Sequence, residues 1–326
     1  MIKEIRNNQD PKMIRIEYMP GNLCNHKCHY CFPGSNEGDA PWPDVELVKT
    51  NLSHLLRHYE SQGKTKSNLY IVGGEPTLWK GLEDLCKHLK DNHDIIIEIS
   101  TNGTRKINWW KENASNFDHV TVSVHREYAN VEHLINVCDT LYEAGTFLNA
   151  DVLMDPDAFN VCTQIVKDLH NSKHNWPIVA KVVHFNGAHR YTDLQLSYFD
   201  ETIKRYPSIE WYTSTTKKPL TKIDIVKDND EIITVDNDSW ITRNKLNYFS
   251  GWECSLGLDI LKIFPNGRIT GNCQQKLYED YNLYQSDFVK KFNPKISPVI
   301  CTKYICGCNG EISANKRKLE DINKIN

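Results

Sequence analysis

The chain has 326 residues, of which 40% are hydrophobic and 25% charged, as is typical of a folded globular protein. Its 39 basic and 42 acidic residues give a formal net charge of −3, so bulk charge does not suggest nucleic acid or a membrane surface as a partner. The apolar runs are shorter than the ~18 residues of a membrane span, and the N-terminal sequence lacks an apolar signal region. We therefore expect a cytoplasmic protein that binds neither nucleic acid nor membrane.

Short β-rich runs alternate with amphipathic segments through the first two thirds of the chain. Strands are expected at 13–19, 68–72, 95–100, 119–124, 147–153 and 178–185. Helices are expected at 44–60, 80–91, 107–116, 129–144, 157–172 and 193–205. This alternation needs right-handed crossovers and a parallel sheet, so it predicts an α/β fold, either a doubly wound sheet or a partial (β/α)6 TIM-type barrel. In both folds the functional residues follow the strands, and the motifs found there favour the barrel.

A polar and irregular segment separates this region from a cysteine-rich tail. We expect a barrel over 1–212, a connection over 213–245 and a small C-terminal α+β domain over 246–326. An extra hairpin around Glu231 to Val235 is an alternative reading of the connection. In the tail, the sequence from Phe264 to Gly267 is typical of a hairpin turn.

Eleven cysteines in such a chain require an explanation. The odd count and the lack of an export signal favour metal binding over a disulfide framework. Three scattered cysteines, Cys86, Cys138 and Cys162, share helical spacing with leucine and other apolar residues, so they are expected to pack in the core.

The strongest motif is Cys24-Asn-His-Lys-Cys28-His-Tyr-Cys31, directly after the first expected strand. Three thiolates at this spacing can ligate three irons of a cubane cluster and leave the fourth iron open to another ligand. A zinc site is the alternative, because His26 or His29 could complete a zinc tetrahedron. The position at the end of a strand favours the cluster, since active sites lie there in β/α folds.

With Tyr30 before its third cysteine, this motif resembles the signature of the radical S-adenosylmethionine (SAM) superfamily. The resemblance implies that Cys24, Cys28 and Cys31 hold a catalytic 4Fe–4S cluster, that SAM chelates its open iron and that Tyr30 lies near the adenine. It also implies the reaction: SAM is reductively cleaved, and the resulting 5′-deoxyadenosyl radical abstracts a hydrogen from a substrate.

Three further strand ends match positions that this superfamily uses for SAM. The cofactor-binding residues that the resemblance implies, besides Tyr30, are Gly73, Gly74, Glu75, Ser100, Asn102 and Ser123. The paired glycines let backbone approach a ligand, and Glu75 can accept from an ammonium group. After Ser123 the family typically has an acidic residue and Gly, whereas this chain has His125 and Arg126.

Three residues are candidates for substrate contacts: His125, Asp151 on the fifth expected strand and His184 on the sixth. His184 can equally be a hydrogen-bonded histidine on a strand. Asp151 can equally satisfy backbone amides.

The tail holds five more cysteines, Cys254, Cys273, Cys301, Cys306 and Cys308. Two cysteines around a hairpin followed by a late group resemble the twitch domain and the related SPASM domain of the superfamily. Five thiols suffice for one 4Fe–4S cluster with one to spare, and the surplus thiol among the last three is left open. A four-cysteine structural zinc site is the alternative.

Together these features predict a SAM-dependent radical enzyme with oxidoreductase-type chemistry. Its cofactors are expected to be two 4Fe–4S clusters and SAM, with an external electron donor such as flavodoxin or ferredoxin. Because only ~12 residues precede the first expected strand, we favour a small-molecule substrate, such as a sugar, nucleoside or amino acid derivative, oxidised with help from the auxiliary cluster. The alternatives are a peptide-modifying radical SAM enzyme, or a zinc, iron–sulfur or electron-transfer protein without SAM chemistry.

Overall fold

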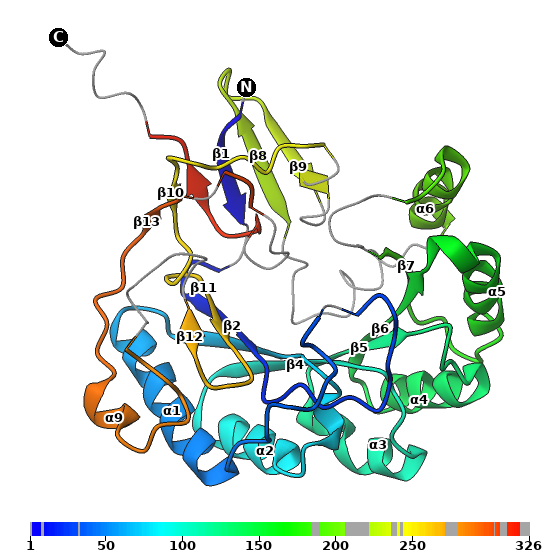
Figure 1. The fold of residues 1–326 in the computed structure, drawn as a ribbon, viewed down its shortest axis with the longest axis horizontal. Helices are drawn as coiled ribbons and strands as arrows, with labels where there is room; N and C mark the ends of the chain where they lie inside the picture. Colours follow the sequence, from blue (N-terminus) through cyan, green and yellow to red (C-terminus); the bar gives the residue numbers. More distant parts are fainter. Residues whose placement is uncertain are drawn as a thin grey trace.

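Two β-sheets and a layer of helices organise the protein in the computed structural model (Figure 1). The structure describes residues 2–7, 10–31, 33–183, 190–205, 222–235, 240–241, 244–270, 280–302, 304–306 and 312–319.

The larger sheet has eight strands in the order β12-β11-β2-β3-β4-β5-β6-β7. They are β2 (Met13–Tyr18), β3 (Lys66–Ile71), β4 (Ile95–Thr101), β5 (His119–Val124), β6 (Phe147–Met154), β7 (Ile178–Val182), β11 (Ile260–Ile263) and β12 (Ile269–Thr270). Strands β2 to β7 are parallel and pair in chain order, which confirms the predicted α/β fold and its six strands. β11 adds a seventh parallel strand beside β2, and β12 pairs with it as the predicted hairpin.

Helices follow the strands as the periodicity predicts. They are α1 (Val45–Ser61), α2 (Leu82–Asn92), α3 (Ile107–Asn113), α4 (Val131–Glu143), α5 (Phe159–Leu169), α6 (Asp193–Arg205), the short α9 (Phe288–Lys291), and the 3-10 turns η1 (Pro76–Leu78), η2 (Ala114–Asn116) and η3 (Pro156–Ala158). Side-chain caps fix two starts, since Asp44 accepts from the Leu47 amide and Asn130 from the His133 amide. Figure 1 shows the helices outside an arc of strands, as in a partial barrel.

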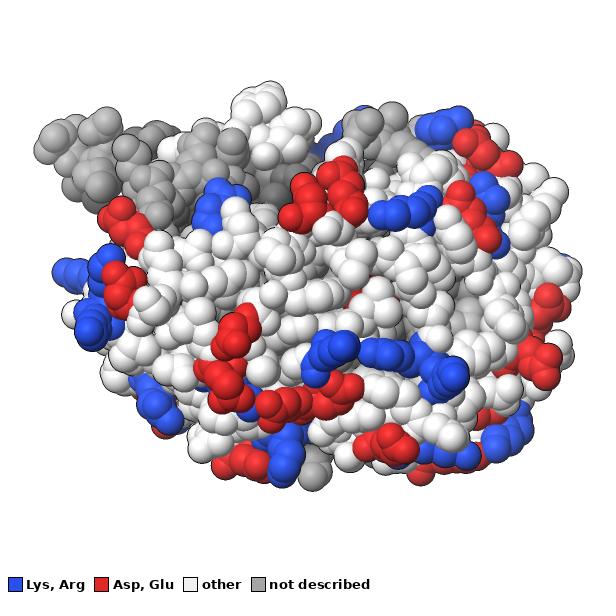
Figure 2. All heavy atoms as spheres, turned by 60° about the horizontal axis from the view of Figure 1, so that its bottom comes forward, with Lys and Arg blue, Asp and Glu red and all other residues white. Residues whose placement is uncertain are grey.

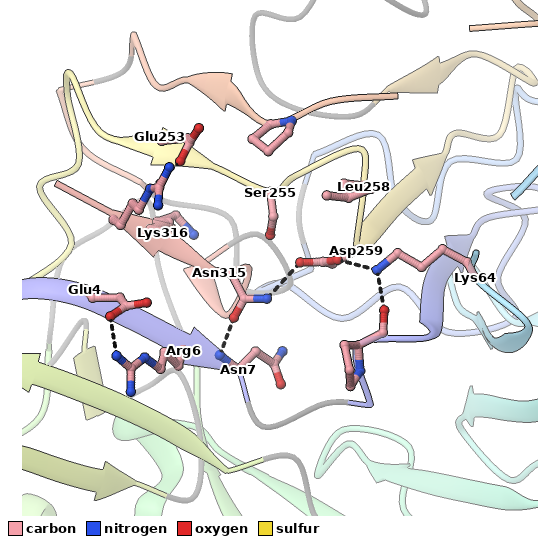
Figure 3. A pocket seen from close by; sticks show the side chains of 13 residues that line it. Glu4, Arg6, Asn7, Lys64, Glu253, Ser255, Leu258, Asp259, Asn315 and Lys316 are labelled. Carbon is pink, nitrogen blue, oxygen red and sulfur yellow. Dashed lines mark hydrogen bonds and ion pairs between the residues drawn. The ribbon is translucent and has the colours of Figure 1, made fainter. Parts of the chain in front are cut away.

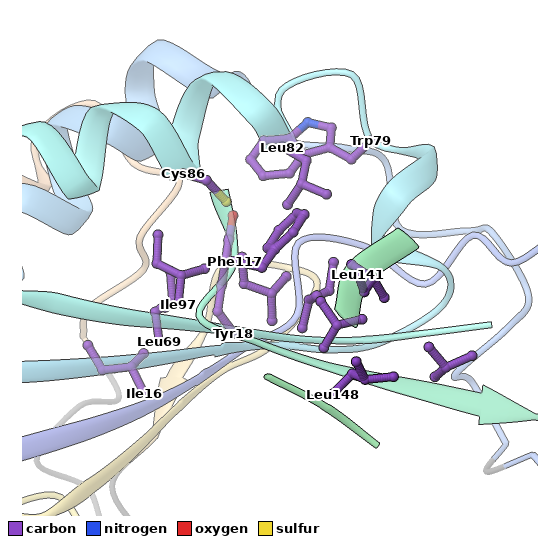
Figure 4. Close-up of a cluster of buried hydrophobic side chains, with 14 of the residues drawn as sticks. Ile16, Tyr18, Leu69, Trp79, Leu82, Cys86, Ile97, Phe117, Leu141 and Leu148 are labelled. Carbon is purple, nitrogen blue, oxygen red and sulfur yellow. The ribbon is translucent and has the colours of Figure 1, made fainter. Parts of the chain in front are cut away.

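The core lies between this arc and the helices (Figure 4). Every second strand residue faces the helices, so Ile16, Leu69 and Ile97 are fully buried there. Each such side chain contributes about 1.5–3 kcal/mol through burial. The three scattered cysteines, Cys86, Cys138 and Cys162, belong to the same core, which confirms their predicted packing role.

The opposite face of the sheet is polar. The residues that alternate with the core positions include Asn68, Glu98, His119, Thr121, Asn149 and Asp151. Most of them are buried and bonded to each other; for example, Asn68 donates to Glu98 at 2.6 Å and His119 contacts Asn149 at 2.6 Å. A polar inner surface of this kind suits a polar ligand.

The smaller sheet is antiparallel, with strands in the order β13-β10-β14-β1-β8-β9. They are β1 (Ile2–Asn7), β8 (Ile223–Lys227), β9 (Ile232–Val235), β10 (Glu253–Cys254), β13 (Val299–Ile300) and β14 (Lys316–Arg317). β8 and β9 form a hairpin inside the expected connection, and β1 joins the chain's first residues to strands of its last third. The division into three segments stays a prediction.

Two surface observations complete the fold. In the described part of the chain, no helix is long and apolar enough to cross a membrane. Figure 2, which brings the bottom of Figure 1 forward, shows basic and acidic side chains interspersed over that face. This mixture agrees with the nearly balanced charge of the sequence.

Candidate active site

The cysteine motif lies in the long loop between β2 and α1. An antiparallel bridge between Leu23 and Glu37 closes this loop on itself. Inside it Asn22 accepts from the Ala40 amide and donates to the Gly34 carbonyl, and the Cys31 amide donates to the Cys28 carbonyl at 3.0 Å. The loop is therefore held by its own hydrogen bonds at the carboxyl edge of the sheet.

The three thiols of this loop influence one another electrostatically. The pKa of Cys28 is raised to about 12, mainly by burial and then by the nearby Glu127, Cys31 and Cys24. The Cys24 sulfur accepts from the His26 amide at 3.3 Å, with the Asn102 amide nitrogen 3.9 Å away. Among the residues described, no group of three His, Cys, Asp or Glu side chains is arranged to hold a single metal ion. Three thiols on one loop, one of them with N–H donors, nevertheless fit the donor set of a cluster held by three thiolates.

The two histidines of the loop have different surroundings. His29 contacts Glu127 through Nδ1 at 2.9 Å and Asp155 through Nε2 at 3.4 Å, so both ring nitrogens face carboxylates. His26 stacks on Tyr128 with ring centres 4.3 Å apart. This arrangement weakens the zinc alternative for His29, which has no nitrogen left for a metal. The His26 Nδ1 is buried without a hydrogen-bond partner in the described structure, so the contacts do not decide against zinc at His26.

The Gly-Gly-Glu-Pro turn packs directly against the start of the cysteine loop. Gly73 and Gly74 have φ angles of 86° and 50°, which favour glycine. A Cβ on Gly74 would lie 2.4 Å from the Leu23 carbonyl oxygen, and the Glu75 amide donates to that same oxygen at 2.8 Å. The end of β3 and the cysteine loop are thus in direct contact through backbone atoms.

Glu75 is buried, and its carboxylate serves the protein's own donors. It accepts from the amide and hydroxyl of Thr77, the hydroxyl of Thr101 and the amide of Asn102, at 2.6–3.1 Å. Burial raises the pKa of this carboxyl, while those hydrogen bonds lower it. These contacts give Glu75 a positioning role between the turn and the end of β4. Its direct contact with a SAM ammonium group stays a prediction.

The ends of β4 and β5 bring the remaining expected cofactor residues together. Ser100 and Ser123 lie side by side on neighbouring strands, with their hydroxyl oxygens 3.2 Å apart. Asn102 donates to the Asn25 side chain at 2.8 Å, and Asn25 in turn donates to Thr104. Asn25, which sequence reasoning missed, thereby ties the cysteine loop to the end of β4.

Tyr30 meets His125 at the end of β5. The phenol oxygen lies 3.1 Å from the His125 Nδ1, and the two rings stack. Burial lowers the pKa of His125 to about 4, with a smaller contribution from His26, so this imidazole is neutral near pH 7. A small pocket lined by His26, Asn102, Ser123 and His125, among others, opens beside it.

Arg126 and Asp155 form a connection that the sequence did not reveal. Asp155 is fully buried and accepts from the Arg126 Nε and Nη2 at 2.7 and 2.6 Å. Its other oxygen caps η3 through the Asp157 amide. Together with the His29 contact, Asp155 links the cysteine loop to the ends of β5 and β6. The one feature of the sequence that could have indicated a role for Asp155 is its position directly after the strand β6.

The expected substrate residues are only partly described. Asp151 is buried on β6, where it accepts from Asn149 and pairs with Lys181 at 2.8 Å, so side chains rather than backbone amides satisfy it. His125 lies at the site as described above. His184 falls outside the described residues.

The cysteines of the tail have apolar surroundings. Cys254 is buried with Leu256, Ile260 and Ala314. Cys306 belongs to a different apolar cluster, which includes Phe249 and Trp252 and against which Cys301 packs. Cys273 and Cys308 lie outside the described residues. The described tail cysteines are thus divided between two clusters, and the second iron–sulfur site stays a prediction.

Sequence comparison finds a family model that matches this region of the chain. Residues 18–136 match the Radical SAM superfamily. Over 96 residues, the chain is 36% identical to an S-adenosylmethionine-dependent nucleotide dehydratase of Fibrobacter sp. (strain UWH6), covering 28% of each chain. Over 154 residues it is 24% identical to a GTP 3',8-cyclase of Klebsiella pneumoniae subsp. pneumoniae, covering 46% of each. The chain thus spans less than half the length of either relative.

Solved structures agree on the fold. Native anSMEcpe with bound AdoMet and Kp18Cys peptide superimposes with a TM-score of 0.54 at 12% identity, over 86% of this chain and 81% of the other. Native anSMEcpe with bound AdoMet gives a TM-score of 0.52 at 14% identity over the same shares. The cysteine loop, the Gly-Gly-Glu-Pro turn and the ends of β4 and β5 all lie within residues 18–136, the region that matches the Radical SAM superfamily, as the first motif predicted.

Proposed function

We propose that this protein is a radical SAM enzyme acting on a small polar molecule. The observation that carries the proposal is the convergence of three separate segments on the cysteine loop. Leu23 accepts from the Glu75 amide, Asn25 from Asn102, and Tyr30 contacts His125. When bound, a 4Fe–4S cluster and SAM supply the chemistry: reductive cleavage of SAM to a 5′-deoxyadenosyl radical that abstracts a substrate hydrogen.

The chain's own residues hold and orient these groups. Cys24, Cys28 and Cys31 are the cluster ligands, and the N–H groups near Cys24 favour its thiolate form against the burial that raises its pKa. The Gly73-Gly74 turn presents backbone to the SAM amino group. Glu75 keeps that turn and Asn102 in register through its buried hydrogen bonds.

The hydroxyl pair and the aromatic pair complete the proposed SAM site. Ser100 and Ser123 contact the ribose or carboxylate, because their hydroxyls stand together at neighbouring strand ends. Tyr30 packs near the adenine, and the neutral imidazole of His125 fixes the phenol through its Nδ1.

The polar inner face of the sheet supports a polar substrate. Beyond the buried groups already described, Lys262 pairs with Glu17 at 3.3 Å and Lys181 pairs with Asp151. Asn68 also keeps a buried side-chain oxygen without a hydrogen-bond partner. The relatives named as nucleotide dehydratase and GTP cyclase are consistent with a nucleoside, but the alignments cover only 28% and 46% of this chain. A sugar, a nucleoside or an amino acid derivative all suit this surface.

The finer features remain part of the same proposal. They are a second 4Fe–4S cluster held by four of the five tail cysteines, a net oxidation that this cluster assists, a flavodoxin or ferredoxin as reductant and a cytoplasmic location. A peptide substrate is the alternative. Direct contacts of His125 and Asp151 with substrate also belong here.

One experiment tests the core of the proposal. The protein is purified without oxygen, its iron, sulfide and zinc are measured, and the dithionite-reduced form is incubated with SAM. We expect iron and sulfide in equal amounts and formation of 5′-deoxyadenosine. Zinc without sulfide, or an intact cluster that leaves SAM uncleaved, would contradict the proposal.

A further inference from the structure

A second pocket lies at the end of the barrel away from the cysteine loop (Figure 3). It has a volume of about 610 Å³, and its barrel side is formed by Pro11, Lys64 and Asp259, which precede β2, β3 and β11. The cysteine loop follows β2, so the length of this strand, roughly 20 Å, separates the two sites. A ligand in this pocket is therefore out of reach of the radical chemistry.

The other side of the pocket is one face of the smaller sheet. Glu4 on β1 and Glu253 on β10 both stand opposite Arg317 on β14. Because side chains alternate along a strand, Arg6 and Ser255 share this face, two residues along from Glu4 and Glu253. The adjacent residues Ile5 and Cys254 belong to apolar clusters. The sheet thus turns a charged row toward the pocket.

The floor of the pocket is fully bonded within the protein. Asn315 accepts from the Asn7 amide at 2.6 Å and donates to Asp259 at 2.8 Å. Lys64 donates to the other Asp259 oxygen at 2.6 Å and to the Pro11 carbonyl at 2.8 Å. These groups join the smaller sheet to the barrel, and they are structural.

Ser255 is different, because its bonding is incomplete. The residue is only 8% exposed, and its hydroxyl oxygen is buried with no hydrogen-bond partner in the described structure. A buried hydroxyl without a partner is unfavourable, and in folded proteins such groups are nearly always satisfied. Its place on the pocket wall points to a group supplied from outside the chain.

Two ion pairs on the same wall are poorly shielded from solvent. Arg6 pairs with Glu4 at 2.7 Å and Arg317 with Glu253 at 2.5 Å, and both arginine side chains are at least half exposed. Exposed pairs of this kind contribute little to stability, so a ligand can open them. A ligand with one charge would leave one partner of the opened pair alone. A ligand with both charges can insert between the partners and restore both contacts.

We propose that this pocket binds a free α-amino acid. Its carboxylate accepts from the Arg317 guanidinium, which offers several N–H donors, and from the Ser255 hydroxyl. Its ammonium group donates to Glu253. The volume of the pocket is in the range of small-molecule sites, and its apolar wall, Leu258 and Pro298, accommodates the ligand's side chain.

Calorimetric titration of the purified chain with each common L-amino acid at millimolar concentration tests this proposal. At least one is expected to bind, and its N-acetyl and carboxamide derivatives, which each lack one charge, are expected not to. Arg317→Gln and Glu253→Gln should each weaken binding about 10-fold, and Ser255→Ala should also weaken it. Arg57→Gln, an exposed arginine of α1, is the matched control and should bind as the parent does.

Three outcomes would overturn the proposal. The first is no binding by any amino acid to the parent protein. The second is equal binding of the N-acetyl or carboxamide derivative, which indicates a site for a single charge. The third is parental affinity in the Arg317→Gln and Glu253→Gln variants. Thermal unfolding of each variant is measured first, so that a loss of binding is assessed only on folded protein.

Discussion

The molecule contains two cysteine-bearing regions with contrasting surroundings. At the end of the barrel, the thiols of Cys24, Cys28 and Cys31 share one loop, with polar groups and N–H donors around them. In the smaller sheet, Cys254 and Cys306 are buried among aliphatic and aromatic side chains in separate clusters. The first environment places N–H donors beside one thiol, although burial raises the pKa of Cys24 and Cys28, whereas the second keeps its described thiols in apolar surroundings.

This difference separates two kinds of inference. The first site rests on contacts between strand ends that are distant in sequence, such as Asn102 with Asn25. The second rests on the spacing of cysteines in the sequence, two of which lie outside the described residues. Variants that remove one thiol from each region, or one contact around the first, test whether the contrast is functional.

The largest effect is expected at Cys28. Cys28→Ala should remove one cluster ligand and lower 5′-deoxyadenosine formation by more than ~100-fold, since even partners behind metal ligands matter by 10- to 100-fold. Cys86→Ala is the control, because this thiol is buried in the core beneath α2. It should lose about 1 kcal/mol of stability and keep SAM cleavage. Unchanged cleavage in Cys28→Ala would refute the ligand assignment.

A smaller effect is expected at Glu75. Glu75→Gln replaces one carboxylate oxygen with an amide nitrogen, which cannot accept a hydrogen bond. At least one of the surrounding donors, from Thr77, Thr101 and Asn102, then faces another donor in a buried position. We expect a loss of about 1–3 kcal/mol in the free energy of unfolding and weaker SAM binding. Equilibrium binding of SAM to the reconstituted protein measures this, with the exposed Glu132→Gln as control. If the Glu75→Gln variant binds SAM as tightly as the parent protein, Glu75 has no positioning role in SAM binding.

Next in order is Asp155, the buried link between the cysteine loop and the ends of β5 and β6. Asp155→Asn should weaken its bonds to Arg126 and His29 and slow SAM cleavage by ~10-fold without loss of iron. A spectroscopic measurement accompanies the rate. With SAM added, the electron paramagnetic resonance signal of the reduced cluster is expected to differ between Asp155→Asn and the parent protein. Asp157→Asn, which removes a surface pair with Arg190, should change neither. If the rate of SAM cleavage and the resonance signal are the same in Asp155→Asn as in Asp157→Asn, Asp155 only stabilises the fold.

The smallest effect on SAM cleavage is expected from the tail. If Cys306 ligates a second cluster, Cys306→Ala should halve the iron content and impair substrate turnover, while 5′-deoxyadenosine still forms. Cys138→Ala, a buried thiol of the barrel core, is the control and should keep full iron. Full iron in Cys306→Ala would leave this residue with the packing role that its apolar surroundings suggest.

Local sequence determined much of the barrel. The alternation of β-rich and amphipathic segments specified six parallel strands and their helices, because periodicity reports which face each residue buries. The rule that functional residues follow strands then placed Cys24, Glu75, Asn102 and Ser123 at one edge of the sheet before any contact was known. The core role of Cys86 and its counterparts followed from the same spacing.

What only the tertiary structure decided involves pairing between distant segments. β1 joins β8 and β14, and β11 extends the barrel beside β2; no local pattern specifies such partners. The same holds for Asp155, whose meaning lies in its contacts with Arg126 and His29. The proposed chemistry of the cysteine loop could be predicted from the sequence because its three cysteines lie within one short segment. The contacts that hold the cysteine loop, and the second pocket, could not be predicted in this way. Strand pairing and side-chain contacts are fixed only when distant parts of the chain pack together.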